Sequence, residues 1–365
     1  MQVLCRRFPC VPSRNKQAFR LILSFLLSLV LWNEWLSFYW SRLGWESHPA
    51  DSNCVRILIV ADPQLIGYRN EPPLFGPISR WDSDGYLRVG FSHAYSFFDP
   101  QAVIFLGDLF DEGVEASAQE ILWTNTRFED IFYVPGSKDM IYISGDNDVG
   151  GEHEFVDSKL VERFRRIFPD FINTLKNSFT ITEVNLMSGA RVVRNVSSPQ
   201  NSRLHILLSH PPYLPFYSGI SPIKDQIDLI LSAHDHTSHT HEKQGRSLET
   251  KNIDSSRPQE RLIGNGRPPF EIQFPTCSYR MGVPRMGYGA VSLCPTSNPR
   301  QFRLIYSILF MPARYLQLFV YLAAVPLLFS VIFFVVQVGF HSLCRSFLLL
   351  HIKFLSFFDP NSPRL

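Results

Sequence analysis

The feature that most constrains this chain is an apolar run towards its C-terminal end. Residues 316–338 contain no charged side chain and consist mostly of Leu, Val, Phe and Ala. About 20 such residues span the hydrocarbon core of a bilayer, and a buried helix of a soluble protein is rarely so long and so apolar. Pro326 interrupts the run, which membrane helices tolerate better than soluble helices do. We therefore predict a transmembrane helix over residues 315–338 and a cytosolic tail over residues 339–365.

A second, shorter apolar segment covers residues 21–40. Glu34 is its one charged residue, aromatic side chains cluster at its end, and residues 1–20 before it carry five basic side chains. A cleaved signal peptide would share the basic start and short apolar stretch, but no cleavage site of small residues follows. The aromatic cluster is typical of a membrane interface. We favour an uncleaved signal anchor over a cleaved signal.

The basic flank decides the expected orientation of the chain. Basic segments stay in the cytosol, so residues 41–314 should form a lumenal domain under either interpretation. If the anchor is retained, residues 1–20 should be cytosolic. Asn195-Val196-Ser197 is an N-glycosylation sequon, which agrees with lumenal exposure. Cys277 and Cys294 flank two strand-like segments and could form a disulfide, in which case Cys54 would stay unpaired. The sequence does not fix the pairing.

Composition excludes two classes of protein. The chain is 45% apolar, which excludes a disordered tail. Its 35 basic side chains nearly cancel its 33 acidic ones, for a net charge of +2, so we expect no nucleic-acid partner.

The segment between the two apolar runs alternates strand-like and helical patterns, which predicts an α/β layered fold. Polar residues with Gly, Ser and Pro over residues 242–269 predict a loop, and we expect His239 and His241 beside it to face solvent. The predicted strands cover residues 55–61, 102–106, 131–134, 140–143, 204–208 and 227–231, and the predicted helices cover residues 84–98, 117–128 and 158–168.

Each of five apolar strands ends in residues that could bind a metal. Any one of them is ordinarily a turn or a helix cap, but ligands collect at the carboxyl ends of strands in α/β sheets. We therefore expect these side chains to converge on a metal centre. They are Asp62, Asp108, the group Asp146-Asn147-Asp148, His210, and the pair His234 and His236.

The order of these residues resembles the calcineurin-like metallophosphoesterases. That family is marked by D-x-[HQ], G-D-x-x-D, G-N-H-D, a lone His and G-H-x-H. The resemblance covers residues 55–293 and implies a four-layer αββα sandwich. This sequence supplies Asp62-x-Gln64, Gly107-Asp108-x-x-Asp111, Gly145-Asp146-Asn147-Asp148, His210 and Ala233-His234-x-His236.

The resemblance also implies the role of each residue. Asp62 and His236 would bind a first divalent metal ion, and Asp108 would bridge two such ions. His210 and His234 would bind the second ion. The family suggests Mn²⁺, and carboxylates with imidazoles suit Mn²⁺, Fe or Zn²⁺ better than Ca²⁺. The implied catalytic residues are Asp108, His234 and Asn147.

The chain departs from the family pattern at two places. Gln64 stands where a His is frequent. In a gap-free match, Asp146 takes the metal-binding Asn position, and Asn147 replaces the His that protonates the leaving group. A one-residue slip instead makes Asn147 the ligand and Asp148 the proton donor. We favour the gap-free match. In that case the proton would have to come from Asp148, His153 or a substrate amine.

The residues in and around the motifs, together with the two apolar runs, resemble a membrane-anchored branch of the family. That branch removes ethanolamine phosphate from glycosylphosphatidylinositol (GPI) anchors. The resemblance implies GPI-anchored proteins as substrates, cargo receptors of the early secretory pathway as partners, and residence at endoplasmic reticulum exit sites and ER–Golgi membranes. Two alternatives remain: a lumenal phosphoesterase for another lipid or a nucleotide, and a catalytically weak cargo-binding protein, which Asn147 favours.

Overall fold

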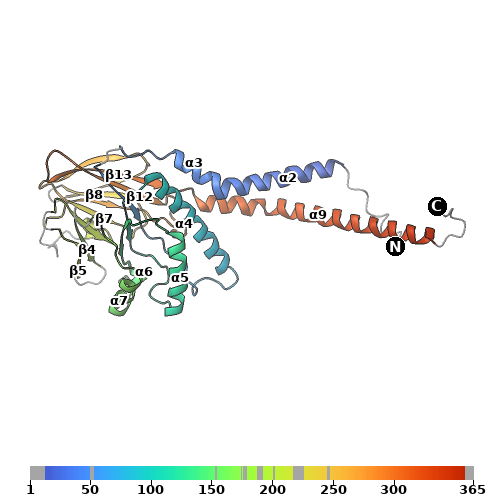
Figure 1. Cartoon of the computed structure of the whole chain (residues 1–365), viewed down its shortest axis with the longest axis horizontal. Coiled ribbons are helices and arrows are strands. Elements are labelled where there is room, and N and C mark those ends of the chain that lie inside the picture. Colours follow the sequence, from blue (N-terminus) through green and yellow to red (C-terminus); the bar gives the residue numbers. More distant parts are fainter. Residues whose placement is uncertain are drawn as a thin grey trace. The chain divides into compact units, whose positions relative to one another are not determined.

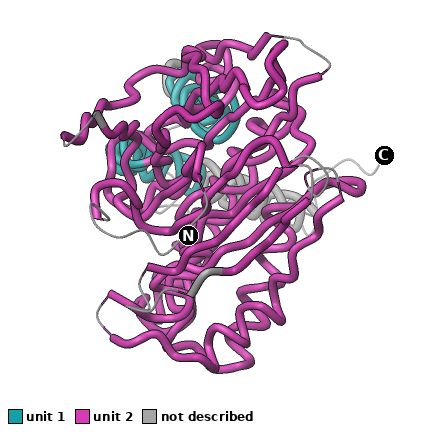
Figure 2. Tube along the Cα trace, turned by 90° about the vertical axis from the view of Figure 1, so that its left-hand side faces the viewer, with its two compact units in different colours: residues 1–37, 315–365 teal, residues 38–314 magenta. Residues whose placement is uncertain are grey.

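The structure is a computed structural model that describes residues 13–357, except 50–52, 153, 174, 176–178, 187–191, 200–201, 217–225 and 245–246. The start of the predicted cytosolic segment and the last eight residues of the predicted tail therefore lie outside the described part. The chain forms two compact units (Figure 2). One combines residues 1–37 with 315–365, and the other covers residues 38–314.

The larger unit contains two β-sheets. The six-stranded sheet has the order β10-β13-β12-β1-β2-β3, and the seven-stranded sheet has the order β5-β4-β6-β7-β11-β8-β9. The strands are β1 Val55–Val60, β2 Ala102–Leu106, β3 Asp139–Ile143, β4 Thr180–Asn185, β5 Val192–Ser197, β6 His205–Ser209, β7 Leu229–Ser232, β8 His239–Gln244, β9 Ser247–Asn252, β10 Gln259–Gly264, β11 Phe270–Gln273, β12 Gly287–Pro295 and β13 Gln301–Phe310.

Helices connect the first three strands. Parallel strands need long crossover connections, and α4 and α5 provide them between β1, β2 and β3 (Figure 1). Inward-facing aliphatic side chains of both sheets, such as Ile57, Ile104, Ile206 and Leu229, form one core cluster, so the sheets pack face to face. The helices of this unit are α3 Ser37–Leu43, α4 Gly76–Phe98, α5 Ala118–Ile131, α6 Asp146–Val149, α7 Ser158–Ile167, α8 Tyr213–Phe216 and the 3-10 helix Tyr279–Met281.

The predicted α/β fold is confirmed, but one of the four expected layers is reduced to a single turn of helix. Tyr213 and Leu214 of α8 pack with Leu207 and Ile230 in a cluster separate from the core between the sheets. Among the described residues, that single turn of helix stands on the outer face of the seven-stranded sheet, where the prediction placed a full fourth layer.

Two local predictions were wrong. Residues 242–269 are not one loop, because they contain much of β8, all of β9 and β10, and the turns between them. β8 and β9 form an edge hairpin whose β9 side chains are mostly exposed, so no apolar alternation marks them. The expected strand at residues 131–134 is absent, because α5 runs to Ile131 and the next strand starts at Asp139.

A disulfide joins Cys54 and Cys294, whose Cα atoms lie 4.1 Å apart. β1 and β12 are antiparallel neighbours and pair Val55 with Leu293, which brings the two cysteines together. The suggested Cys277–Cys294 pair is therefore wrong, and Cys277 is a buried free thiol. Structural disulfides persist in oxidising compartments and are rare in the cytosol.

The smaller unit is built from two apolar helices. α2 (Ser13–Leu31) continues through a π-helical turn (Trp32–Leu36), and α9 covers Arg314–Phe357. Tyr321 donates a hydrogen bond to Glu34 (2.6 Å), which gives the one acidic side chain of the first run a partner. Residues 17–43 and 314–337 are long and apolar enough to cross a membrane by length and composition. α9 continues as a helix past the predicted end of the span at residue 338.

Candidate metal centre

The strand ends bring five of the predicted ligands into two groups. Asp62, Asp108 and Asp146 follow the parallel strands β1, β2 and β3, and His210 and His234 follow the parallel strands β6 and β7 of the other sheet. In each group, one ligand atom per residue lies within 4.8 Å of the others. The groups are Asp146 with His210 and His234, and Asp62 with Asp108 and His210.

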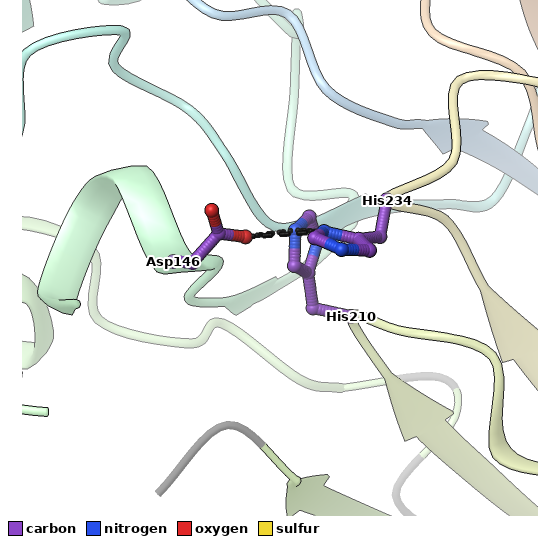
Figure 3. Close-up of side chains that lie close together, drawn as sticks. All are labelled: Asp146, His210 and His234. Carbon is purple, nitrogen blue, oxygen red and sulfur yellow. Dashed lines mark hydrogen bonds and ion pairs between the residues drawn. The ribbon is translucent and has the colours of Figure 1, made fainter. Parts of the chain in front are cut away.

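In the first group, two imidazoles converge on one carboxylate (Figure 3). The Asp146 Oδ1 atom lies 3.1 Å from Nε2 of His210 and 3.1 Å from Nδ1 of His234. The Nδ1 atom of His210 donates to the carbonyl oxygen of Leu106 at 2.7 Å. This bond fixes the ring orientation and leaves Nε2 facing the site, as in many metal-binding histidines.

In the second group, two buried carboxylates lie beside His210. Asp62 and Asp108 are 0% and 2% exposed, and Oδ1 of Asp108 lies 3.4 Å from Nε2 of His210. Oδ2 of Asp108 accepts hydrogen bonds from the side-chain amides of Gln64 and Asn147, each at 3.0 Å. Oδ1 of Asp62 is buried and has no hydrogen-bond partner in the described structure.

Backbone strain marks the same residues. A positive φ is uncommon for residues other than glycine and costs of order 1–3 kcal/mol. Among the described non-glycine residues, seven have a positive φ, and five of these are candidate site residues. Such strain collects at functional sites, where the surrounding structure holds it in place. The five are Asp62, Gln64, Asp108, His234 and His236.

Two motif glycines leave room for the ligands. A Cβ atom on Gly107, whose φ is +89°, would lie 2.5 Å from Nδ1 of His210. A Cβ atom on Gly145 would lie 2.0 Å from Oδ1 of Asp108. Each glycine before an aspartate of the motifs is therefore required by the packing of a ligand from another segment.

The two groups differ in their electrostatics. Burial raises the pKa of Asp62 to about 8, the nearby Asp108 carboxylate adds to this, and His210 opposes it. Burial would also raise the pKa of Asp146, but its hydrogen bonds with His210 and His234 hold that pKa well below its usual range. The histidines therefore outweigh burial at Asp146, whereas burial outweighs the opposing effect of the histidines at Asp62.

This donor set fits a pair of divalent cations. A carboxylate oxygen buried without a hydrogen bond is costly unless a cation or a proton compensates it. Oδ1 of Asp62 is such an atom, and Nδ1 of His210 lies 3.7 Å from it. The Nε2 atom of His210 lies close to carboxylate oxygens of both groups. A proton or a cation must therefore lie between this nitrogen and those oxygens. Carboxylates with imidazoles suit Mn²⁺, Fe or Zn²⁺.

Gln64 and His236 stand outside both groups. Gln64 donates through Nε2 to Asp108 and lies 3.2 Å from Nε2 of His236. It therefore presents its amide nitrogen to the site in this structure, and not the carbonyl oxygen that a metal would need. His236 is half-buried and pairs with Gln64 at the edge of the Asp62 group.

The three side chains at residues 146–148 have different surroundings. Asp146 lies in a ligand group, and Asn147 holds Asp108 through its backbone and side-chain amides. Asp148 instead accepts hydrogen bonds from the backbone N–H groups of Leu109, Phe110 and Gly145. It is 3% exposed and holds that loop in place. His153 lies outside the described residues.

His241 corrects another prediction. It is 4% exposed, and its ring nitrogens lie 2.9 Å from Oγ1 of Thr250 and 3.0 Å from Oε1 of Gln273. It is buried on the seven-stranded sheet beside Thr250 of β9 and Gln273 of β11, because β8 is a strand and not part of a loop. His239 is half-buried and bonded to Thr237.

A pocket of about 190 Å³ opens beside Asp146 and Asn147. Its other walls include five acidic residues, of which only Asp111 belongs to one of the motifs named above. Burial raises the pKa of Asp111 to about 6, against the opposing effect of Arg280. The segment Gly107–Glu115 contains three of these carboxylates, but their spacing in the sequence gave no sign that they share a pocket. The five are Asp111, Glu112, Glu115, Glu152 and Glu154.

No protein-family model matches the chain, but curated proteins do. It is 27% identical over 208 residues to cell division control protein 1 of Saccharomyces cerevisiae, which covers 52% of this chain and 42% of that protein. It is 30% identical over 137 residues to metallophosphoesterase 1 homolog of Drosophila melanogaster, which covers 36% and 34% of the two chains. A match to metallophosphoesterase 1 of Danio rerio, at 30% identity over 114 residues, covers 31% of this chain and 29% of that one.

These matches span less than half of each relative's own length. Among solved structures, the chain is similar to a metallophosphoesterase from Sphaerobacter thermophilus, with a TM-score of 0.34 and 10% identity over 70% of this chain and 88% of that one. It is also similar to a 5'-nucleotidase precursor from Thermus thermophilus, with a TM-score of 0.37 and 12% identity over 76% and 59% of the two chains. At these TM-scores the two similarities assign nothing by themselves.

Proposed function

We propose that this relative of the calcineurin-like metallophosphoesterases, similar to proteins named metallophosphoesterase 1, is a membrane-anchored phosphodiesterase that uses two divalent metal ions. The observation that carries the proposal is that five motif residues form two ligand groups that share His210, with Oδ1 of Asp62 buried and without a hydrogen-bond partner. Similarity to curated metallophosphoesterases supports the same chemistry. Mn²⁺ is the proposed metal.

The protein's own residues prepare the site. Asp62, Asp108, Asp146, His210 and His234 would hold the two ions, with His236 at the edge of the Asp62 group. Two such ions, when bound, polarise a phosphoryl group and lower the pKa of a water molecule to near neutrality. Gln64 and Asn147 hold the Asp108 carboxylate in one orientation through three hydrogen bonds. The bond to Leu106 keeps His210 in a single tautomer.

Asn147 stands where the family has a proton-donating His, so the chemistry at this position must differ. Its amide donates a hydrogen bond to Asp108, and an amide cannot transfer a proton at neutral pH. General acid catalysis is typically worth about 10²–10⁴-fold, so the proton for the leaving oxygen has to come from another group, and an ammonium group on the substrate would supply it.

Ethanolamine phosphate on a GPI anchor is the proposed substrate. The ammonium group of ethanolamine carries a positive charge, and the pocket beside Asp146 and Asn147 is lined by acidic side chains. The disulfide and the exposed sequon residue Asn195 on β5 suit a lumenal location. Two apolar helices suit membrane anchoring. We further propose ER exit sites and ER–Golgi membranes as the location, and cargo receptors as partners.

The test has a chemical and a cellular arm. The purified full chain with Mn²⁺ should hydrolyse bis(p-nitrophenyl) phosphate, and chelation should abolish this. Cells that lack the protein should retain ethanolamine phosphate on the glycan of their GPI anchors. Phosphodiesterase turnover with an unchanged GPI glycan would keep the enzyme and reject the substrate. No turnover of any phosphoester by fully metal-loaded protein would reject the enzyme.

The lumenal location has its own test. Residues 41–314 should resist protease in intact microsomes and become sensitive when detergent is added. Asn195→Gln should remove a mobility shift that endoglycosidase also removes. Digestion of the domain in sealed microsomes would place it in the cytosol.

A second candidate is a catalytically weak protein that binds GPI-linked cargo through the same site. The observation in its favour is Asn147, because the family's proton donor is missing. It predicts stoichiometric metal and tight binding of a phosphodiester without turnover.

A further inference from the structure

Four large apolar side chains stand exposed where α4 begins. Leu74, Phe75, Ile78 and Trp81 are 76%, 59%, 61% and 74% exposed. Ile78 and Trp81 are three apart within α4 and so lie on one side of it, and Leu74 and Phe75 lie in the turn that leads into the helix. We call these four residues the apolar tip. Single exposed apolar residues are normal on a protein surface, but a cluster of them marks an interaction site.

The apolar tip is held in place by a network of contacts. The N–H groups of Phe75 and Gly76 donate to the carbonyl oxygen of Pro72 at 3.0 and 2.8 Å. Arg80 donates to the carbonyl oxygen of Gly67 at 3.0 Å, and its guanidinium lies 4.3 Å above the ring of Tyr68. The tip is therefore presented in a fixed shape before it meets a partner.

The same helix holds both ends of the larger unit. Asp82, the residue after Trp81, forms a buried ion pair with Arg314, the residue where α9 begins. Tyr86 donates to the carbonyl oxygen of Pro312 at 2.9 Å and packs against Phe38 with 5.5 Å between ring centroids. Both points at which the chain leaves this unit for the apolar helices therefore lie against α4.

We propose that the apolar tip inserts into the interface of the bilayer that the apolar helices span. This inference rests on the proposed membrane anchoring and not on the chemistry of the metal centre. Ile78 lies one helical turn, about 6 Å, from Asp82, so the tip is close to the point where α9 starts. Trp is enriched at membrane interfaces, and Leu, Ile and Phe bury their side chains in the boundary between headgroups and acyl chains.

The tip is also connected to the metal centre. Residues 65–73 lead from Gln64 to the tip, and Asn70 of this segment lines the acidic pocket. The carboxylate of Glu112 accepts hydrogen bonds from the backbone N–H groups of residues 68–70, which fixes the segment against the motif that contains Asp108. An inserted tip would hold the pocket at headgroup level, where a lipid-linked phosphodiester presents its polar part.

Photocrosslinking of the full chain in nanodiscs tests the insertion directly. The probe is p-benzoylphenylalanine placed at Ile78 or at Trp81, in nanodiscs of phosphatidylcholine with a radiolabelled fraction. Leu248 is the matched control, because it is an apolar side chain, 39% exposed, on the edge strand β9. We expect the yield of labelled lipid at positions 78 and 81 to be about tenfold the yield at position 248. A side chain inserted in the bilayer contacts acyl chains, whereas one that stays outside the bilayer contacts water.

Equal yields at the three positions would overturn the insertion, and so would a photoproduct between two protein chains in place of lipid.

A second variant, with Leu74→Ser, Phe75→Ser, Ile78→Ser and Trp81→Ser, reports on function. It should lower turnover of a phosphodiester headgroup lipid in the same nanodiscs by about tenfold and leave turnover of bis(p-nitrophenyl) phosphate unchanged. Equal turnover of the headgroup lipid by variant and wild type would contradict the role of the tip. Failure of the metal chemistry would abolish both turnovers and leave the crosslink intact.

Discussion

The two ligand groups share His210 but differ in how their charge is balanced. In the Asp146 group, two imidazoles offset one carboxylate, and the pKa of Asp146 lies well below its usual range. In the Asp62 group, two buried carboxylates share one imidazole, and burial raises the pKa of Asp62 to about 8. The carboxylate of the first group is paired with two imidazoles, whereas Oδ1 of Asp62 in the second group has no hydrogen-bond partner. Metal binding should therefore matter most on the Asp62 side.

The position of the histidines explains the difference. His210 and His234 both come from the seven-stranded sheet and reach Asp146 across the gap between the sheets. The Asp62 side has Gln64 where the family often has a His, and His236 bonds to that glutamine. The Asp146 group thus contains two imidazoles and the Asp62 group one.

The largest expected effect comes from Asp108→Ala. This carboxylate belongs to the Asp62 group and lies 3.4 Å from the shared His210, so its loss should remove metal from both positions. We expect phosphodiesterase activity to fall by at least about 10³-fold. Asp99→Ala is the matched control, because Asp99 also has a positive φ but pairs with Arg56 away from the site. Full activity of purified Asp108→Ala protein would reject the shared site.

The next effect separates the two groups by metal content. His210→Ala should bring bound metal from two ions per chain to below one, because both groups use this imidazole. His236→Ala should remove at most one ion, because this side chain stands at the edge of the Asp62 group. Elemental analysis after dialysis measures both. If the two variants lost the same amount of metal, the groups would not be distinct.

Stability without metal should change in opposite directions on the two sides. Below pH 3.8, Asp62 is protonated in both folded and unfolded chains, and the folded state loses stability as the pH rises from there towards about 8. Asp62→Asn removes this loss, so at pH 8 it should raise the Tm of the chelated protein by about 2–4 °C. Asp146→Asn removes pairs with two histidines, so it should lower the Tm.

Thermal unfolding in EDTA at pH 4 and pH 8 measures both variants. The gain from Asp62→Asn should be present at pH 8 and absent at pH 4, because the carboxyl is neutral at the lower pH. A decrease of the Tm by Asp62→Asn in EDTA at pH 8 would show that the Asp62 charge is already balanced by the protein.

The smallest effect should come from Gln64→His. A second imidazole beside His236 supplies the donor that the Asp62 side lacks, so the weaker metal should bind about tenfold more tightly. Competition with a metallochromic chelator measures the affinity of each ion. Loss of affinity would indicate that the hydrogen bond from Gln64 to Asp108 outweighs the missing ligand.

The sequence predicted the strands that carry the site. Val55–Ala61 and Ala102–Leu106 are apolar on both faces, as buried parallel strands are, and polar residues at their carboxyl ends had to meet at one edge of a sheet. The sequence could not predict β8 and β9, because an edge hairpin with polar faces is held by backbone hydrogen bonds that leave no apolar pattern.

Other features depend on contacts between distant segments. The pairing of Cys54 with Cys294 follows from the register of β1 and β12, which are far apart in the chain. The role of Asp148 follows from three N–H groups that only the folded loop brings to it. The acidic pocket combines side chains from the loops after β2 and β3 with Asn70. No local spacing encodes these contacts.

The measurement that tests the central claim most directly is electron paramagnetic resonance of the full chain loaded with Mn²⁺. Two ions held by both groups would lie about 3.5–4 Å apart, so at two equivalents the spectrum should show a spin-coupled pair, and at one equivalent the six-line signal of a single ion. Two isolated six-line signals at full loading, or no protein-bound Mn²⁺, would contradict a shared two-metal centre.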